Sequence, residues 1–437
     1  MTSPFETART LQQYRGIHRD EQRWYATVLK CFWIFMSAIL LVACSSPRTS
    51  SPSPLPTLAR TAINLGPTAT WTPVPPSPTA LPPEPTYVPI PTISETDWYL
   101  GPKEAPITFL VYSDFQCPYC AKLAPVIKEL IAIHPNDLRV VFRHFPIKIL
   151  HDKASLAGEA AQAAGEQGHF WEMHDVLFER QNEWVNLSVP DFIEWLNDVA
   201  VDLELNIELF KDDIESGRYI LMMEENFQTG ISYGLMGTPS IFINGTYFGL
   251  DPTLSMLEAS IRLELLEPKR QRNYPSNTLA EGASYFATLE MDIGRVVIQL
   301  YPDSAPNAVN SFIYLAQSGW YNDNPIFNII PGKYLETGDP SGTGFGDQGY
   351  HFDIEIDPTL QFDRSGLVAL SSSGPNTNGS RFFITLSALP ELDGTRTIFG
   401  RVIDGFEILT QLNEREPMRD LLLPPEATIL TITIEEK

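Results

Sequence analysis

The stretch Ile107-Thr-Phe-Leu-Val-Tyr-Ser-Asp-Phe-Gln-Cys-Pro-Tyr-Cys120 joins a β-rich apolar run to a helix-like run from Ala121 to Ile133. Two cysteines separated by two residues at a strand-to-helix junction are typical of a redox motif. A helix N-terminus stabilises a thiolate through unpaired N–H groups and the helix dipole, and it tolerates proline at the first helical position. We therefore predict Cys117 as the nucleophile and Cys120 as the resolving thiol.

A zinc half-site or a structural disulfide is the alternative role for this cysteine pair. Zinc needs two further ligands at metal-binding spacing, and the sequence has no second pair of this kind. We expect His144, His169 and His174 to be structural, because they do not form a cluster with ligand spacing. A disulfide between such close residues closes too small a loop to stabilise the fold much. Thiol–disulfide exchange without a metal or cofactor is therefore the favoured chemistry.

The beginning of the chain is typical of an export signal. Basic residues precede a short apolar run from Cys31 to Ala43, and Leu41-Val-Ala-Cys44 resembles a bacterial lipobox. We predict that Cys44 is lipidated and anchors an extracytoplasmic chain to the cell membrane. An uncleaved membrane anchor from Trp24 to Cys44 is the alternative, although Lys30 interrupts it. Outside the cytoplasm, an oxidising compartment suits a dithiol that works as a catalyst.

The composition indicates globular domains on a tether. The chain has 437 residues, a formal net charge of −24 and 43% hydrophobic residues, which is enough for two domains with cores. The acidity argues against nucleic acid as a partner and against a polybasic contact with lipid. A Pro/Ser/Thr-rich segment and a later polar stretch mark the boundaries. They predict an anchor over 1–44, a disordered stalk over 45–96, a first domain over 97–267, a linker over 268–283 and a second domain over 284–437.

The first domain has the predicted order strand, helix, strand, helices, strand, hairpin, helix. In Gly237-Thr-Pro-Ser-Ile-Phe-Ile-Asn-Gly245 a proline enters an apolar strand, which indicates a special backbone geometry. With the Cys-Pro-Tyr-Cys motif and Gln167-Gly-His-Phe-Trp-Glu-Met-His174, the segment resembles the DsbA-like branch of the thioredoxin superfamily. The resemblance implies an α/β thioredoxin fold with a helical insertion over about 152–230. It also implies that Pro239 is cis and faces the active disulfide, and that Thr238 binds extended substrate.

One departure from the family pattern concerns proton transfer. Many relatives bury a carboxylate six residues before the first cysteine, and Val111 stands at that position here. The nearest acid is Asp114. We therefore expect proton transfer to and from Cys120 to differ from that in the family.

The second domain consists of short β-rich runs with turn signals, interrupted by one helical run from Ala305 to Ser318. This pattern of short strands and turns indicates a β-barrel or a β-sandwich. The stretches Leu300-Tyr-Pro-Asp-Ser-Ala-Pro306, Gly374-Pro-Asn-Thr-Asn-Gly-Ser380 and Phe382-Phe-Ile-Thr385 resemble cyclophilin peptidyl-prolyl isomerases. The resemblance implies an all-β, eight-stranded barrel with two helices.

The polar positions of the cyclophilin pocket are altered in this sequence. Cyclophilins use an arginine to weaken the amide resonance of the X–Pro bond, and that arginine becomes Asn328. The other altered positions are Lys333, Glu336, Arg381, Glu391 and Arg396, whereas Phe383, Leu392 and Phe399 retain the apolar floor. Asparagine cannot replace a charge-assisted donor, so we expect weak peptide binding and poor isomerisation, unless Arg381 or Arg396 substitutes for the missing arginine.

The sequence thus predicts a membrane-anchored extracytoplasmic folding factor that carries out thiol–disulfide exchange on exported proteins. The expected partners are unfolded or exported clients, an unidentified redox partner and the membrane. Two alternatives stay open: a prolyl isomerase or chaperone whose thioredoxin domain mainly recruits clients, and a non-catalytic surface scaffold. Oxidase, isomerase and reductase share these motifs, so the redox direction is also open.

Overall fold

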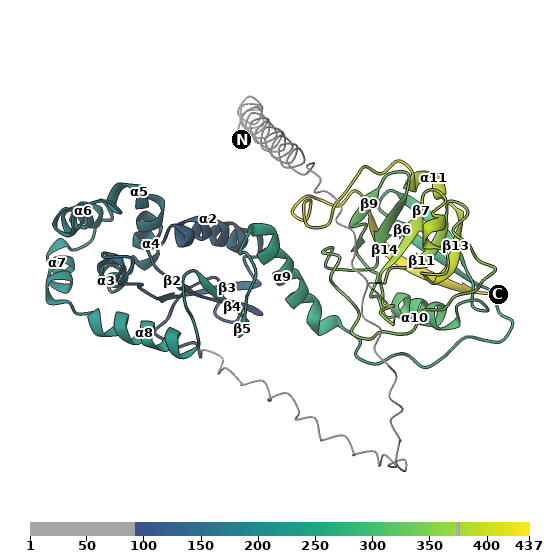
Figure 1. The fold of residues 1–437 in the computed structure, drawn as a ribbon, viewed down its shortest axis with the longest axis horizontal. Coiled ribbons are helices and arrows are strands. Elements are labelled where there is room, and N and C mark those ends of the chain that lie inside the picture. Colours follow the sequence, from purple (N-terminus) through teal and green to yellow (C-terminus); the bar gives the residue numbers. More distant parts are fainter. Residues whose placement is uncertain (1–91, 373, 375) are drawn as a thin grey trace, which may run out of the picture. The chain divides into compact units, whose positions relative to one another are not determined.

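A computed structural model describes residues 92–437, apart from Ser373 and Pro375. The predicted signal, the lipidated Cys44 and nearly all of the stalk lie outside the described residues. Within the described part, no helix is both long enough and apolar enough to cross a membrane. The described residues form a mixed α/β domain followed by an antiparallel β domain (Figure 1).

The first domain is built on a five-stranded sheet with the order β1-β3-β2-β4-β5. The strands are β1 (Trp98–Leu100), β2 (Ile107–Ser113), β3 (Leu138–His144), β4 (Ser240–Ile243) and β5 (Thr246–Tyr247). The parallel pair β2 and β3 is almost fully buried, because helices cover both faces of the sheet. Alternate residues of β2 pack on α2 (Pro118–Ile133) and α9 (Leu254–Leu266) and on the opposite side near α8 (Ile220–Ser232).

A helical insertion lies between β3 and β4 (Figure 1). Besides α8, the insertion contains the helices α3 (Ala154–Gly165), α4 (Phe170–Glu179), α5 (Gln181–Trp184), α6 (Val189–Asp202) and α7 (Ile207–Ser216). Ten of the twelve residues of α3 are buried, because its many alanine and glycine residues are small and let α4 and α7 approach closely. The predicted thioredoxin-type α/β fold with a helical insertion is therefore confirmed.

The second domain is one antiparallel sheet with the order β8-β14-β6-β7-β13-β11-β12-β10-β9. The strands are β6 (Tyr285–Met291), β7 (Gly294–Leu300), β8 (Asn324–Pro325), β9 (Asn328–Ile330), β10 (Tyr334–Thr337), β11 (Leu367–Leu370), β12 (Phe382–Thr385), β13 (Ile398–Asp404) and β14 (Thr428–Glu436). The helices are α10 (Pro306–Gln317) and the short α11 (Phe406–Leu409). The β fold with two helices is confirmed. Nine strands are described rather than eight, since β8 is a two-residue strand paired with β14.

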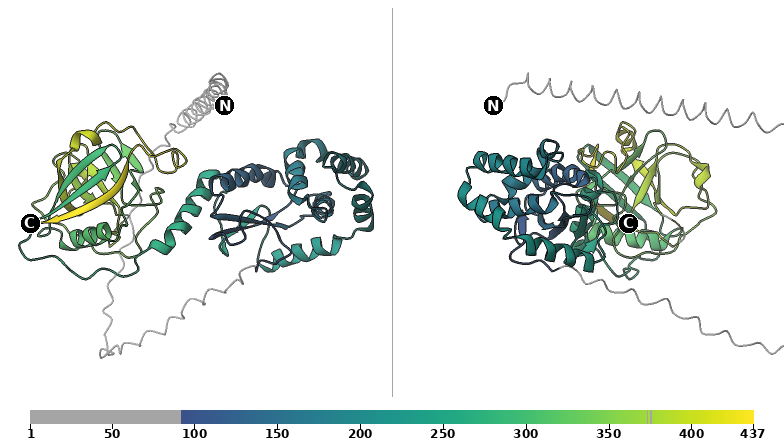
Figure 2. Two further views of the ribbon diagram at one scale, coloured as in Figure 1. Left: turned by 180° about the vertical axis from the view of Figure 1, so that it is seen from behind. Right: turned by 60° about the vertical axis from the view of Figure 1, so that its left-hand side comes forward.

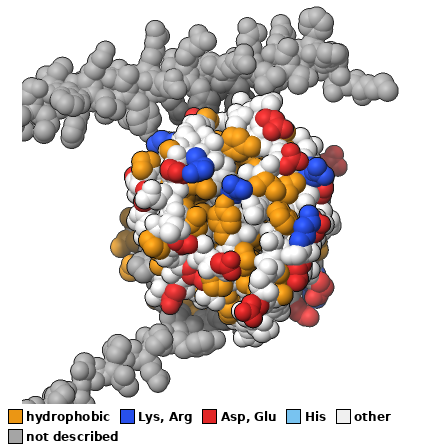
Figure 3. Space-filling model, turned by 90° about the vertical axis from the view of Figure 1, so that its right-hand side faces the viewer, with side chains coloured by type: hydrophobic (Ala, Val, Ile, Leu, Met, Phe, Trp, Pro, Cys, Tyr) orange, Lys and Arg blue, Asp and Glu red, His pale blue; other side chains and the backbone are white. Residues whose placement is uncertain are grey.

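The core of the second domain is formed by side chains of the curved sheet and of α10. In the left view of Figure 2, α10 lies at the lower end of the sheet. Phe312 of α10 packs against Phe382 of β12 and Phe399 of β13, with ring centroids 5.5 Å and 5.3 Å away. On the face of this domain that Figure 3 shows, acidic and basic side chains are interspersed with hydrophobic ones. This face is therefore not dominated by charge of one sign.

Candidate active site

The two thiols of the Cys-Pro-Tyr-Cys motif lie at the N-terminus of α2. Cys117 is the N-cap residue with an extended backbone, and Pro118 is the first helical residue. Cys120 lies in the first turn of the helix. Both thiols are free, and they are 4% and 1% exposed. The structure thus brings both predicted redox residues together where the strand β2 gives way to the helix.

Contacts distant in sequence hold the loop before this helix. The buried carboxylate of Asp114 accepts hydrogen bonds from the backbone N–H of Gln116 (2.8 Å) and of Ile147 (2.9 Å), and His151 Nδ1 lies 2.8 Å away. The amide of Gln181 in α5 donates to the carbonyl oxygens of Phe115 (2.8 Å) and Cys117 (3.1 Å). These contacts hold the backbone of the nucleophile, Cys117, and of the two residues before it.

The surroundings of the two thiols shift their pKa values in opposite directions. The hydrogen bond from the Cys120 thiol is the largest cause that lowers the pKa of Cys117, and Thr238 and the backbone N–H groups of Tyr119 and Cys120 add to it. Burial opposes these contacts, and the resulting pKa of Cys117 is about 6. Burial, assisted by the neighbouring Cys117, raises the pKa of Cys120 well above its usual value. At neutral pH the outer sulfur is thus a thiolate and the inner one a thiol.

A loop that precedes β4 faces the nucleophile. The Thr238–Pro239 peptide bond is cis, as the resemblance implies. Cys117 Sγ lies 3.4 Å from the Thr238 carbonyl oxygen, to which the protonated form of the thiol donates a hydrogen bond. Thr238 and Pro239 also line a cavity of about 670 Å³, together with the almost fully exposed Met236. An apolar, open cavity beside the reactive sulfur has room for an extended peptide.

The histidines of the first domain do not form a metal site. His144 is buried, its Nε2 lies 2.9 Å from the Gln162 amide, and burial lowers its pKa to about 3. His174 lies in an aromatic cluster beside Phe115 and Phe142, whereas His169 is more exposed. Among the residues that the structure describes, no group of three or more His, Cys, Asp and Glu side chains could hold a metal ion.

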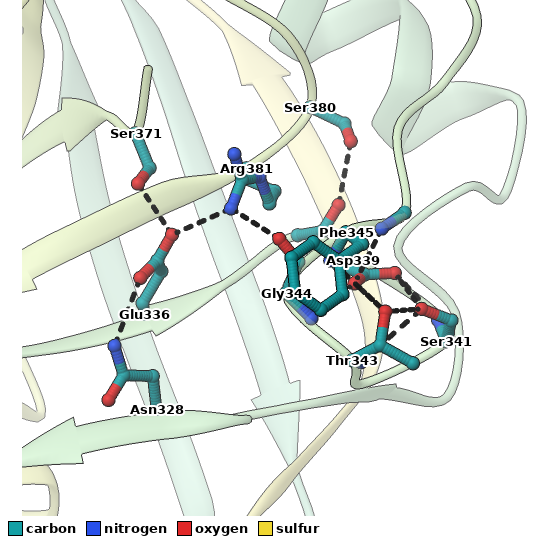
Figure 4. Close-up of polar contacts among 12 residues, drawn as sticks. Asn328, Glu336, Asp339, Ser341, Thr343, Gly344, Phe345, Ser371, Ser380 and Arg381 are labelled. Carbon is teal, nitrogen blue, oxygen red and sulfur yellow. Dashed lines mark hydrogen bonds and ion pairs between the residues drawn. The ribbon is translucent and has the colours of Figure 1, made fainter. Parts of the chain in front are cut away.

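In the second domain, a polar network connects β9, β10 and the residue before β12 (Figure 4). Glu336 accepts a hydrogen bond from the amide of Asn328 over 3.2 Å and another from the hydroxyl of Ser371. Its other contact is an ion pair with Arg381 at 3.6 Å. Arg381 also donates to the Gly344 carbonyl over 2.6 Å. The guanidinium is therefore held between a carboxylate and a carbonyl oxygen.

The loop that presents the Gly344 carbonyl is organised by one buried carboxylate. Asp339 is fully buried and accepts hydrogen bonds from the backbone and hydroxyl of Ser341 at 2.8 and 2.6 Å, and from the backbone N–H groups of Gly344 and Gly346 at 2.8 and 3.0 Å. Figure 4 shows this loop beside Arg381. A carboxylate with this many hydrogen bonds fixes the loop. It therefore also fixes the Gly344 carbonyl oxygen that Arg381 contacts.

Comparison with known proteins identifies both domains. Residues 286–434 match the model of the cyclophilin type peptidyl-prolyl cis-trans isomerases, and residues 93–262 match a thioredoxin model. Peptidyl-prolyl cis-trans isomerase-like 3 of Rhizopus delemar is 39% identical over 157 residues, which cover 34% of this chain and 92% of that protein. The chain belongs to the cyclophilin-type peptidyl-prolyl isomerase family. It is a thioredoxin-like domain fused to a cyclophilin domain.

Other similar proteins align with only part of this chain, and in some cases the aligned region is also only part of the similar protein. The Na(+)/H(+) antiporter NhaA 1 of Salinispora arenicola is 37% identical over 156 residues, which cover 36% of this chain. The chain spans only 23% of the length of that antiporter. A crystal structure of a Cryptosporidium parvum cyclophilin type isomerase has 35% identity and a TM-score of 0.32, and it covers 35% of this chain and 98% of that chain.

The structure does not bring all the predicted pocket residues of the cyclophilin domain together. Phe383 and Leu392 belong to one apolar cluster around Phe362. The structure does not place Phe399 with them, because this side chain is fully buried in the barrel core. Arg396 donates to the adjacent Thr395 carbonyl over 2.9 Å, and the remaining predicted positions, Lys333 and Glu391, are exposed.

Sequence reasoning missed several residues that support the two sites. Gln181, His151 and Ser371 contact site residues that lie at least 35 positions away in the chain. Their residue types and local surroundings carry no signal for these contacts, which depend on the tertiary fold. The motif at Cys117 and the pairing of Glu336 with Arg381 involve positions that the sequence did single out.

Proposed function

We propose that the protein is a DsbA-like, membrane-anchored extracytoplasmic folding factor that exchanges disulfides with exported proteins. The observation that carries this proposal is the Cys117 thiol at the start of α2, whose pKa is about 6, beside a buried Cys120 whose pKa is raised. A thiolate outside and a thiol inside is the arrangement that disulfide exchange requires.

The exchange proceeds in two steps that balance atoms and electrons. The Cys117 thiolate attacks one sulfur of a client disulfide, which forms a mixed disulfide and releases one client thiolate. The Cys120 sulfur then attacks Cys117 Sγ, loses its proton, and releases the second client thiolate. The client is reduced and the dithiol is oxidised to a Cys117–Cys120 disulfide. Client oxidation is the same sequence in reverse.

The decisive experiment traps the mixed disulfide. Cys120→Ser in the full-length chain removes the resolving thiol, so covalent adducts with client proteins accumulate on Cys117. The matched variant Cys117→Ser lacks the nucleophile and forms no such adducts. Equal trapping by both variants, or by neither, would reject the proposed exchange. The direction follows from the reduction potential, near about −120 mV for an oxidant and about −270 mV for a reductant.

The cyclophilin domain is proposed to be a proline-peptide binder with weak isomerase activity. Membership of the isomerase family supports proline as the recognised residue. Asn328, at the position where the family has its arginine, has a neutral side chain that donates to Glu336. Arg381 is engaged by Glu336 and Gly344. A prolyl isomerase or chaperone in which the thioredoxin-like domain mainly recruits clients remains the second candidate, and the family match favours it.

A further inference from the structure

A second cavity of about 280 Å³ lies between α2, the central strands and α4, and Cys120 is part of its wall. Apolar side chains form most of this wall. Its remaining polar side chains are Ser113, Lys128, His174 and Asp175. Liquid water takes about 30 Å³ per molecule, so the volume suffices for several water molecules between these groups. The buried thiol therefore borders the same cavity as an imidazole.

His174 is held in a defined orientation at this wall. Its Nδ1 lies 3.0 Å from one carboxylate oxygen of Asp175, and the other oxygen accepts a hydrogen bond from Lys128 over 2.9 Å. Since Lys128 favours the ionised form of Asp175, the carboxylate can only accept, and Nδ1 carries the hydrogen. The second ring nitrogen, Nε2, is then a free acceptor in the neutral ring.

The charged and titratable groups around His174 come from three elements. Lys128 lies on α2, Asp175 on α4, and the buried His144 on β3. Burial is the largest effect and lowers the pKa of His174, whereas Asp175 opposes it. The imidazole is therefore neutral at neutral pH, which is the form that can accept a proton.

We propose that His174 accepts the proton of Cys120 across this cavity when Cys120 attacks the mixed disulfide, a role that rests on the proposed thiol–disulfide exchange. The thiol must lose its proton to attack Cys117, and the side chain of Ser113 hydrogen bonds to it. As the Cys120–Cys117 bond forms and the client thiolate leaves, the proton passes to Nε2. Asp175 stabilises the imidazolium. The return of the proton to solvent resets the residue.

A purely structural role for His174 has to be distinguished from this one. The ring packs beside Phe142, Trp171 and Phe178, with centroid distances of 5.1, 5.0 and 4.9 Å. An aromatic side chain without a titratable nitrogen could serve such packing. Only proton acceptance makes the second step of the exchange depend on the titration of this residue.

The test resolves the two steps in the full-length reduced protein with dithiobis(nitrobenzoate). Release of the first coloured thiolate reports attack by Cys117, and release of the second reports attack by Cys120. In the wild type we expect the second rate to be flat across neutral pH and to fall as the pH drops through the lowered pKa of His174, because the imidazolium cannot accept a proton.

His174→Gln is expected to slow the second release on the order of 100-fold at neutral pH. The remaining rate should rise about tenfold per pH unit, since only hydroxide then removes the proton. The first release should be unchanged, so a failure of the proposed exchange itself would be seen separately. The matched control is His144→Gln, a buried histidine that does not line this cavity; its second release should match the wild type.

Two further variants keep the inference falsifiable if His174→Gln disturbs folding. Asp175→Asn, at a partly exposed position, should slow the second release about tenfold, because it removes the charge that stabilises the imidazolium. Val111→Glu places a carboxylate in the same wall and should restore a flat pH profile to His174→Gln. A second release with wild-type rate and pH profile in His174→Gln or Asp175→Asn, or no restoration by Val111→Glu, would overturn the inference.

Discussion

At the scale of single residues, the start of α2 sets the two thiols apart. Cys117 precedes the helix and contacts its unpaired N–H groups, whereas Cys120 lies within the first turn, where burial favours the neutral thiol. The helix N-terminal place of Cys117 could be predicted from the sequence, because the motif and the start of the helix are local signals. The contribution of Thr238 and the burial of Cys120 depend on the tertiary fold. The carbonyl contacts of Gln181, 64 and 66 positions away, could not be predicted, since only the tertiary fold creates them.

The pH dependence of alkylation follows from the two pKa shifts. Iodoacetamide should modify Cys117 at a nearly constant rate above the pKa of about 6, because the thiolate is then fully formed. Below that pH the rate should fall about tenfold per unit as the thiolate is protonated. Cys120 should stay unreactive at neutral pH, since its pKa is raised. Mass spectrometry of the alkylated peptides measures both rates; equal reactivity of the two thiols would contradict the assignment.

Gln181 offers a second prediction at this scale. Gln181→Ala removes the donor for two buried carbonyl oxygens, of Phe115 and Cys117. Buried acceptors without a partner are destabilising by about 1–3 kcal/mol, which chemical denaturation of the reduced protein would measure. The control is Asn182→Ala at the next, exposed position, where a change within about 0.5 kcal/mol is expected. Equal effects of both substitutions would reject the supporting role of Gln181.

At the scale of elements, the predicted helices nearly coincide with the observed ones. The run from Ala121 to Ile133 is part of α2, which begins at Pro118, and the run from Ala305 to Ser318 corresponds to α10 at Pro306–Gln317. Periodicity and Ala or Pro positions are local signals, so these elements were predictable. The two-residue strand β8 was not, because its existence depends on pairing with β14, more than a hundred residues later.

The burial of α3 predicts low tolerance for larger side chains. Ala160 is fully buried, so Ala160→Leu should overpack the helical insertion and reduce the free energy of unfolding by about 1–3 kcal/mol. The same substitution at the exposed Ala132 of α2 should change it by less than about 0.5 kcal/mol. Thermal or urea unfolding compares the two variants. A stable Ala160→Leu protein would show that α3 is less tightly packed than described.

The side-chain contacts among Asn328 of β9, Glu336 of β10 and Arg381, which precedes β12, predict the isomerase behaviour of the full-length chain. Loss of a preorganised donor typically lowers the rate on the order of 100-fold, so an X–Pro test peptide should isomerise far more slowly than with a cyclophilin that has the arginine. Arg381→Ala and Arg396→Ala should each change this residual rate by less than about twofold. A rate typical of active cyclophilins that either substitution abolishes would show that a relocated arginine performs the catalysis.

At the scale of the whole molecule, the chain combines a thioredoxin-like domain with a cyclophilin domain. The composition predicted two globular parts, and the structure describes a mixed α/β part and a β part. The proposed anchor at Cys44 lies outside the described residues, so it is tested by processing. Cys44→Ala should accumulate a longer precursor and lose the lipid, as seen by labelling with a radioactive fatty acid. Cys31→Ala, within the predicted signal, should be processed normally.

Two outcomes would contradict the predicted anchor at Cys44. An N-terminal peptide from upstream of residue 44, recovered from the mature wild-type protein, would rule out cleavage before Cys44. Normal processing of Cys44→Ala would do the same.

The burial of the nucleophile Cys117 affects the stage of a client's folding at which this protein would act. Cys117 is only 4% exposed, and the cis Thr238–Pro239 loop borders its sulfur. A disulfide inside a compact client cannot reach such a recessed sulfur, whereas one on a loose, extended strand can enter the neighbouring cavity. In the proposed exchange, access would therefore act as a steric filter on the folding state of the client. Exchange would be confined to chains that are still incompletely folded, and would stop by itself once a client has buried its cysteines.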